Sequence, residues 1–144
     1  MQTVFPDVSE RSKVLLLSSG DAGTVLLQEI IARHADAATA SDIDGMLNLL
    51  AEESYDIFFC DWRFAMGTWR DALEEIQRQD PEMPVIVVCR TGGQQEWREV
   101  LEAGASDLLT APYCERVVLS VLERALAHGR GSRRISEGAP QTVC

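Results

Sequence analysis

One stretch of the sequence decides the fold: YDIFFCD, residues 55–61. Its apolar run has the length of a buried strand and stops at an acidic residue, Asp61. The other strand-like runs stop at Ser18-Ser19, Cys89 and Ala111. Open α/β folds bind ligands at the carboxyl ends of their strands. The sequence therefore predicts a carboxylate at the functional edge of a sheet.

Length and composition are those of an ordinary globular domain. The chain has 144 residues, of which 46% are hydrophobic and 25% are charged, and this predicts one domain with a core of its own. The formal net charge of -10 argues against nucleic acid and anionic membranes as partners of this domain, because binding phosphates needs a basic face. No segment has the pattern of a signal peptide or a membrane span, so we expect a cytoplasmic protein.

The cysteines show no metal-binding pattern. None of the four has a C-x-x-C neighbour, and two of them end apolar runs. We therefore expect reduced thiols rather than a disulfide framework or a zinc site. The four are Cys60, Cys89, Cys114 and Cys144.

Strand-like segments alternate with helical patterns along the chain, which predicts parallel strands joined by crossover helices. We expect this domain to span residues 13–128, with an N-terminal extension over 1–12 and a tail or linker over 129–144. The expected strands are 13–17, 35–39, 55–60, 84–89 and 106–110. The first expected helix ends near 34, the second starts at 41, and the third runs from 68 to before 80. The fourth spans 94–103 and the fifth spans 113–128.

Helix ends have recognisable signals. Ser41 with Asp44, and Thr68 with Asp71, have the spacing of capping boxes at the starts of two helices. Gly104 is placed to end the helix over 94–103. The stripe expected to be buried on the last helix is Val117, Val118, Val121, Leu122, Ala125 and Leu126.

Three groups of residues then identify a family. Residues 55–62, residues 84–88, and Gly104 to Asp107 followed by Pro112 stand in the order and spacing of a response-regulator receiver domain of bacterial two-component signalling, which residues 13–128 resemble. The resemblance implies an α/β fold with a flavodoxin-like, doubly wound, five-stranded parallel sheet in the order 2-1-3-4-5. It also implies that Asp61 is the phosphoacceptor and that the peptide bond before Pro112 is cis.

The partners of this aspartate have changed. The resemblance implies an acidic pair for Mg²⁺ after the first strand, a hydroxyl after the fourth, and a lysine and a switch aromatic on the fifth. Those positions hold Ser18 and Ser19, Cys89, Ala111 and Leu108 respectively. Phosphoryl transfer depends almost wholly on positioning and electrostatic stabilisation. We therefore predict a pseudo-receiver that is not an enzyme, with impaired or absent aspartyl phosphorylation.

Other residues near the site leave alternatives open. Asp61 is the only carboxylate at the matched positions, so we expect weak or absent Mg²⁺ binding and no other cofactor. Asp21 is favoured as a helix N-cap, with a substitute Mg²⁺ ligand as the alternative. Arg63 and Arg90 are either solvated charges or supply an ion pair to Asp61. In the loop after Asp61, Ala65 stands where the family usually has proline.

The resemblance also implies a partner surface. We expect a histidine kinase or an output protein to bind the face of the fourth helix, fifth strand and fifth helix, with a homodimer as the alternative. One alternative function is a working response regulator still phosphorylated at Asp61. Another, from a different class, is a flavodoxin-like phosphate or FMN binder that uses the loop Ser18–Thr24, with Trp62 or Trp69 beside the flavin.

Overall fold

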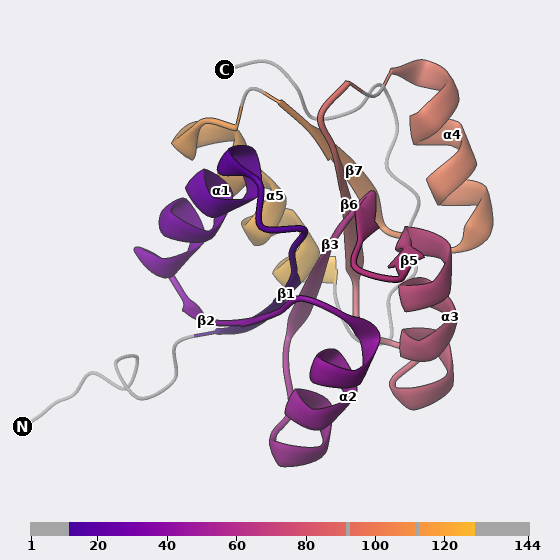
Figure 1. Cartoon of the computed structure of the whole chain (residues 1–144). Coiled ribbons are helices and arrows are strands. Elements are labelled where there is room, and N and C mark those ends of the chain that lie inside the picture. The colour runs from indigo at the N-terminus through magenta and orange to yellow at the C-terminus, as the bar shows by residue number, and fades with distance from the viewer. Residues whose placement is uncertain (1–11, 92, 112, 129–144) are drawn as a thin grey trace, which may run out of the picture.

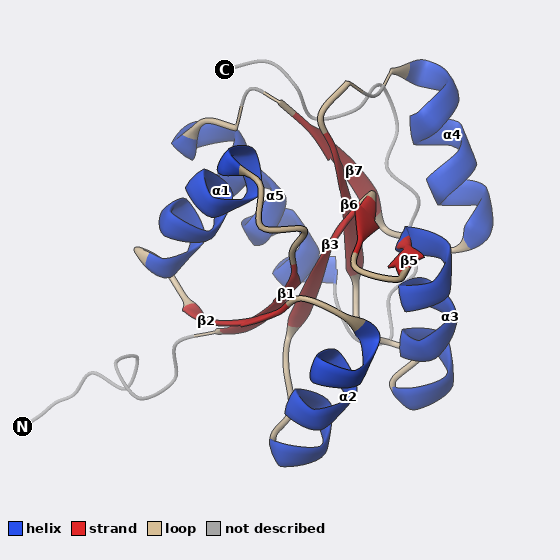
Figure 2. Cartoon of the chain, viewed as in Figure 1, coloured by secondary structure: helices blue, strands red, loops and turns tan. Residues whose placement is uncertain are grey.

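The fold is a five-stranded parallel sheet with helices on both faces, as Figures 1 and 2 show. The structure, a computed structural model, describes residues 12–91, 93–111 and 113–128. The strands are β1 (Lys13–Leu17), β2 (Asp36–Ala40), β3 (Ile57–Asp61), β4 (Arg63–Phe64), β5 (Gly67–Thr68), β6 (Val85–Cys89) and β7 (Asp107–Thr110). The helices are α1 (Ala22–Ala32), α2 (Ile43–Glu52), α3 (Trp69–Gln79), α4 (Gln94–Ala103) and α5 (Glu115–His128).

The main sheet confirms the predicted topology. Its strand order is β2-β1-β3-β6-β7, and every neighbouring pair is parallel. Because β6 and β7 are the fourth and fifth strands of this sheet, the order is the expected 2-1-3-4-5. The carboxyl ends of all five strands therefore lie along one edge, and Asp61 ends the central strand.

Two apolar layers hold the helices on the sheet. Successive strand residues point to opposite faces, so Phe58 packs on the side of α2, α3 and α4, and Phe59 packs on the side of α1 and α5. Both phenylalanines are fully buried. Strands buried on both faces read as continuous apolar runs, which explains why β3 and β6 show no polar alternation.

The helix ends follow local chemistry. Thr68 and Asp71 form the predicted capping box of α3, and Gly104 ends α4 with φ of 114°. The prediction for Ser41 was wrong, because Asp42 is the N-cap of α2 and accepts a hydrogen bond from the Gly45 N–H at 2.8 Å. Asp42 follows Ser41 directly, and its carboxylate caps the first turn of α2 in place of the serine hydroxyl.

A short antiparallel hairpin, which the sequence did not predict, follows β3. Arg63 pairs with Thr68 and Phe64 pairs with Gly67, so β4 and β5 form a two-stranded sheet of their own. Met66 lies at its tip with φ of 69° and is 98% exposed. Positive φ is unfavourable for a residue with a side chain, so the tip carries backbone strain.

The remaining expectations have mixed outcomes. Leu126 is exposed rather than part of the buried stripe of α5. Cys60 and Cys89 are free thiols as expected, whereas Cys114 is disulfide-bonded, so the prediction that all four are reduced was wrong. In the described part of the chain no helix is long and apolar enough to cross a membrane. The extension over 1–11, the tail over 129–144 and the bond to Pro112 lie outside the described residues.

Candidate functional site

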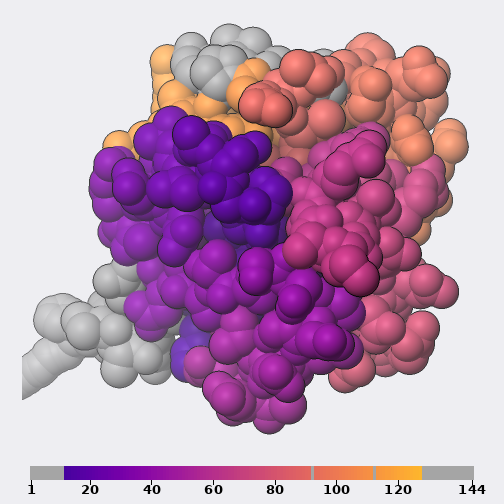
Figure 3. All heavy atoms as spheres, in the orientation of Figure 1, coloured from indigo at the N-terminus to yellow at the C-terminus, as the bar shows by residue number. Residues whose placement is uncertain are grey.

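Asp61 lies at the carboxyl end of β3 and keeps only 9% of its surface exposed. Its Oδ2 accepts a hydrogen bond from the Ser19 N–H at 3.0 Å, and its Oδ1 accepts one from the Trp62 N–H at 2.9 Å. The carboxylate thus joins the loop after β1 to the loop after β3. In Figure 3 the indigo start of the described chain meets the magenta segment after β3 at the surface.

Burial controls the chemistry of this carboxyl group. It raises the pKa of Asp61 above its usual value, the hydroxyl and N–H of Ser19 oppose the rise, and the nearby charge of Asp21 adds to it. Desolvation disfavours a charged form, and hydrogen bonds to that form favour it. The net effect is a raised pKa, so the protonated form of Asp61 is more favoured in the protein than in water. Among the residues described, no cation pairs with Asp61 to reverse this effect.

The loop after β1 is held by its own hydroxyls. Ser18 is buried, donates to Thr24 Oγ1 at 3.0 Å and accepts from the Gly20 N–H at 2.9 Å. Asp21 is the N-cap of α1, as favoured from the sequence, and accepts from the Thr24 N–H at 2.9 Å. That bond lowers the pKa of Asp21. The side chains at the two positions that the resemblance assigns to Mg²⁺ are hydroxyls, and Ser18 is fully engaged within the loop.

The other altered positions lie at the ends of β6 and β7. Cys89 pairs in register with Thr110, the residue before Ala111. Burial raises the pKa of the Cys89 thiol, which keeps it neutral, and a thiol is only a weak donor. Ala111 is half-buried and packs against the layer of α1 and α5. Neither side chain offers a charge to Asp61.

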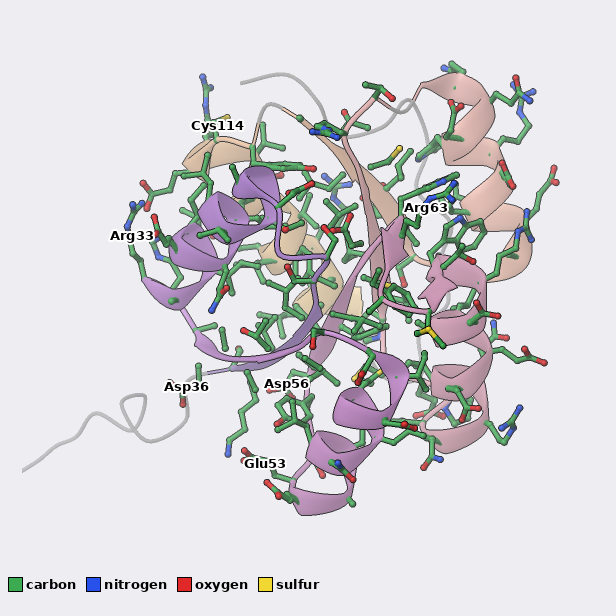
Figure 4. The ribbon with its side chains drawn as sticks, in the orientation of Figure 1. Arg33, Asp36, Glu53, Asp56, Arg63 and Cys114 are labelled. Carbon is green, nitrogen blue, oxygen red and sulfur yellow. The ribbon has the colours of Figure 1, made fainter. Side chains whose placement is uncertain are left out.

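The two candidate arginines do not pair with Asp61. Arg63 and Arg90 are exposed, and within residues 12–91 neither forms an ion pair with this aspartate. Figure 4 shows Arg63 on the side of the sheet that carries α3 and α4. The positive charge of Arg90 instead acts on Asp21 and on Tyr113, whose pKa values it lowers.

Tyr113 belongs to this site, although the sequence marked it only as the start of the last helix. Its side chain is 8% exposed, and its ring lies so close to Gly23 that an added Cβ there would sit 3.3 Å from it. Burial raises the pKa of its hydroxyl, and the charges of Asp61 and Asp21 raise it further. The signal in the sequence was the position of Tyr113 directly after the loop that follows the fifth strand, at the edge of the sheet where Asp61 lies.

Side-chain contacts join Trp62, which directly precedes the hairpin, to α3, and join α3 to α4. The rings of Trp62 and Trp69 are tilted, with centroids 5.4 Å apart, and the guanidinium of Arg70 lies 4.6 Å from the centroid of Trp69. Arg70 also pairs with Glu99 of α4. Further along, Gln77 Nε2 donates to the carbonyl oxygen of Ala103 at 3.3 Å. Helix α4 is therefore attached to α3 at its middle and at its end.

The face of α4, β7 and α5 contains a partly buried ion pair. Asp107 is 4% exposed, accepts from the Leu108 N–H at 2.8 Å and meets Arg124 Nη1 at 3.3 Å. Burial raises the pKa of Asp107, and the Leu108 N–H and Arg124 oppose the rise. Leu108, at the position of the switch aromatic, is fully buried. Leucine has no polar group at the end of its side chain, so a rotation of Leu108 would not exchange a solvent-exposed position for a buried one as an aromatic side chain with a hydroxyl does.

No ready-made metal centre stands out in the described ranges: they contain no group of three or more His, Cys, Asp or Glu side chains placed to hold a metal ion. Mg²⁺ requires a nearly octahedral set of oxygen ligands. Asp61 and Asp21 bring carboxylates to this site, and both already accept backbone hydrogen bonds.

Fold and site together define a class of protein. A family model described as the response regulator receiver domain matches residues 22–123, so the chain belongs to that family. It is a receiver domain of the two-component response-regulator type, with a flavodoxin-like fold.

Two curated relatives illustrate the similarity. Response regulator protein PilR of Pseudomonas aeruginosa is 30% identical over 103 residues, which are 71% of this chain and 23% of PilR. Transcriptional regulatory protein ZraR of Escherichia coli is 32% identical over 116 residues, or 80% of this chain and 26% of ZraR. The chain therefore spans about a quarter of the length of these relatives.

Solved structures share the fold. The receiver domain of NtrX from Brucella abortus aligns with a TM-score of 0.73 at 24% identity, covering 79% of this chain and 98% of that one. Chemotaxis response regulator CheY4 of Vibrio cholerae aligns with a TM-score of 0.69 at 17% identity, covering 81% and 99%. At these identities the likeness establishes the fold alone.

Proposed function

We propose that this chain is a pseudo-receiver: a receiver module that signals by binding a protein partner in a fixed conformation, with impaired or absent Mg²⁺-dependent phosphorylation of Asp61. The observation that carries the proposal is the state of Asp61. Each of its carboxylate oxygens accepts a backbone N–H, and neither forms an ion pair with a described cation.

The energetics support slow phosphorylation. Each charge-assisted hydrogen bond contributes roughly 1.5–3 kcal/mol, and each ~1.4 kcal/mol changes a rate tenfold. Serines replace the family's acidic pair, and Ala111 replaces its lysine. Losing these groups should slow transfer by several powers of ten, although such contributions do not add simply.

The packing supports a fixed conformation. A ligand shifts an equilibrium only as far as it binds two states differently. Cys89 is a weak donor to a phosphoryl oxygen, and Leu108 is an apolar residue already packed in the core. The attachment of α4 to α3 through Arg70 and Gln77 further opposes movement of α4.

The partner surface that we propose is the face of α4, β7 and α5. The partly buried pair of Asp107 with Arg124 joins β7 to α5 there, which supports a face presented in one arrangement. A histidine kinase or an output protein is the proposed partner, with a homodimer through the same face as the alternative. Mutating exposed residues of this face should weaken partner capture without changing the fold.

Beryllofluoride tests the proposal directly. Amide spectra of the protein with Mg²⁺, with and without beryllofluoride, should differ little along α4 and β7. Intact mass after treatment with acetyl phosphate and Mg²⁺ should show little or no added phosphoryl group. Large changes along Gln94–Ala103 and Asp107–Thr110, absent in Asp61→Asn, would mean that the switch works and that the chain is a phosphorylated receiver.

Mg²⁺ binding has its own test. Trp62 follows Asp61 directly, so its fluorescence should report an ion bound to the carboxylate. We expect no saturable change below about millimolar Mg²⁺, because too few oxygen ligands are free. A saturable change abolished by Asp61→Asn would show that Asp21 or another acid completes a metal site.

A further inference from the structure

The hairpin of β4 and β5 holds one methionine in solvent. Met66 is 98% exposed, whereas the two other methionines that the structure describes, Met46 and Met83, are 0% and 4% exposed. A thioether in solvent meets dissolved reagents freely, but a buried one reacts only when the structure around it opens. The molecule therefore places the same functional group in two opposite environments.

The backbone at Met66 shows that the fold imposes this exposure. Its φ of 69° is unfavourable for a residue with a side chain, so neighbouring contacts must hold the turn. Phe64 is 6% exposed, and its ring lies so close to Gly67 that an added Cβ there would sit 2.9 Å from it. The Thr68 N–H donates to Asp71 at 3.0 Å. Strained residues are concentrated at functional sites, which makes Met66 a candidate for one.

Both ends of the hairpin are anchored. The Trp69 N–H donates to the carbonyl oxygen of Trp62 at 3.1 Å, and the centroids of the two indole rings lie 5.4 Å apart. Trp69 is itself buried. These contacts stand between the tip and the packed layers of the domain, so a chemical change at Met66 leaves the core in place.

We propose that Met66 is a site of reversible oxidation, at which a hydroperoxide converts the thioether to a sulfoxide while the fold is kept. The sulfur attacks one oxygen of the O–O bond, a sulfur–oxygen bond forms, and the rest of the peroxide leaves as water or an alcohol. Sulfur loses two electrons, and the peroxide takes them up. A thiol-dependent methionine sulfoxide reductase reverses the step: two thiols become a disulfide, and the oxygen leaves as water.

The oxidation changes the surface of the hairpin. A sulfoxide is polar and chiral where the thioether is apolar, and in a core this change disrupts packing. Met66 is in solvent, so its oxidation instead alters what the hairpin offers to a partner. The inference does not depend on the state of Asp61, so it stands apart from the proposal of a pseudo-receiver.

Peptide mapping by mass spectrometry tests the proposal on the intact chain. The protein is treated with excess hydrogen peroxide, and the gain of oxygen is followed separately at Met46, Met66 and Met83. In the native protein we expect Met66 to react at least about tenfold faster than the other two, because their oxidation requires opening of the core. In urea the three rates should agree within about twofold, because burial no longer distinguishes these residues.

Reversal and the fold give a second readout. Amide spectra of the oxidised protein should change along residues 62–69 and stay unchanged in the sheet. Methionine sulfoxide reductases for both epimers, with dithiothreitol, should restore the spectrum and the unmodified Met66 peptide. Met66→Leu keeps an apolar side chain without sulfur, so peroxide should leave its hairpin spectrum unchanged.

Each outcome decides the matter. Fast uptake at Met66 that the reductases reverse, and a silent hairpin in Met66→Leu, would support the proposal. Native Met46 or Met83 reacting as fast as Met66, spectral changes spread through the sheet, or oxidation at Met66 that the reductases do not reverse would overturn it.

Discussion

Replacing Arg124 by alanine should destabilise the domain through Asp107. The pair lies between β7 and α5, where Asp107 is 4% exposed and the Arg124 side chain is 35% exposed. Breaking a fully buried ion pair costs about 3–5 kcal/mol, whereas exposed pairs contribute about 0–1 kcal/mol. Solvent screens Arg124 in part, so we expect a loss of about 2 kcal/mol in the free energy of unfolding. In a domain of this size that lowers Tm by about 4–8 °C.

Urea denaturation at pH 7 measures this loss, with Arg78→Ala as the matched control. Arg78 is 60% exposed and pairs with Glu75 on the surface of α3, so its removal should cost no more than about 0.5 kcal/mol. A double variant, Asp107→Asn with Arg124→Ala, should recover much of the loss, because a neutral amide needs no cation beside it.

The pH dependence gives a further check. Burial raises the pKa of Asp107, and removing Arg124 raises it more. A carboxyl group with a raised folded-state pKa contributes stability that is present at low pH and is lost as pH rises through that pKa. The deficit of Arg124→Ala should therefore shrink on acidification. A cost equal to that of Arg78→Ala, or a deficit that does not shrink in acid, would refute the reasoning.

Three further predictions concern the backbone and Asp61. Met66→Gly should stabilise the domain by about 1 kcal/mol in urea denaturation, because the φ of 69° suits glycine, whereas Ala65→Gly should not stabilise it. Gly104→Ala should lower the free energy of unfolding by about 1–2 kcal/mol, because its φ of 114° disfavours a side chain, while Gly93→Ala should be better tolerated. Carbon NMR of the Asp61 carboxyl should give a pKa above the ordinary value of about 3.9. The contribution of Asp61 to stability should then fall as pH rises through that pKa. A pKa at or below the ordinary value would contradict the effect of burial.

The sequence predicted the sheet well because its strands are buried on both faces. Such strands read as uninterrupted apolar runs, and the helices between them carry clear end signals such as Thr68 with Asp71. The hairpin after β3 was missed because its tip, Ala65 and Met66, lacks the glycine or asparagine that usually marks such turns. Tertiary packing imposes that turn on residues that disfavour it.

The site was predicted in position but not in its contacts. The spacing of the strand ends placed Asp61, Cys89 and Ala111 at one edge of the sheet, because parallel strands align these ends. Which way a long side chain such as Arg90 turns depends on neighbours brought in by the fold, and no spacing encodes it. The contribution of Tyr113 was missed for the same reason, since its burial depends on packing against Gly23 of α1.

The attachment of α4 to α3 has a consequence for local opening. Arg70 and Gln77 of α3 hold Glu99 and Ala103 of α4, so the two helices cannot open separately without breaking these contacts. Neighbouring elements often open together as one cooperative unit, which hydrogen exchange of their amide protons detects. Hydrogen exchange should therefore give the most protected amides of both helices the same opening free energy. Because an exposed ion pair contributes only about 0–1 kcal/mol and the Gln77 contact remains, removing the Arg70 guanidinium should lower the opening free energy of α4 by no more than about 1 kcal/mol.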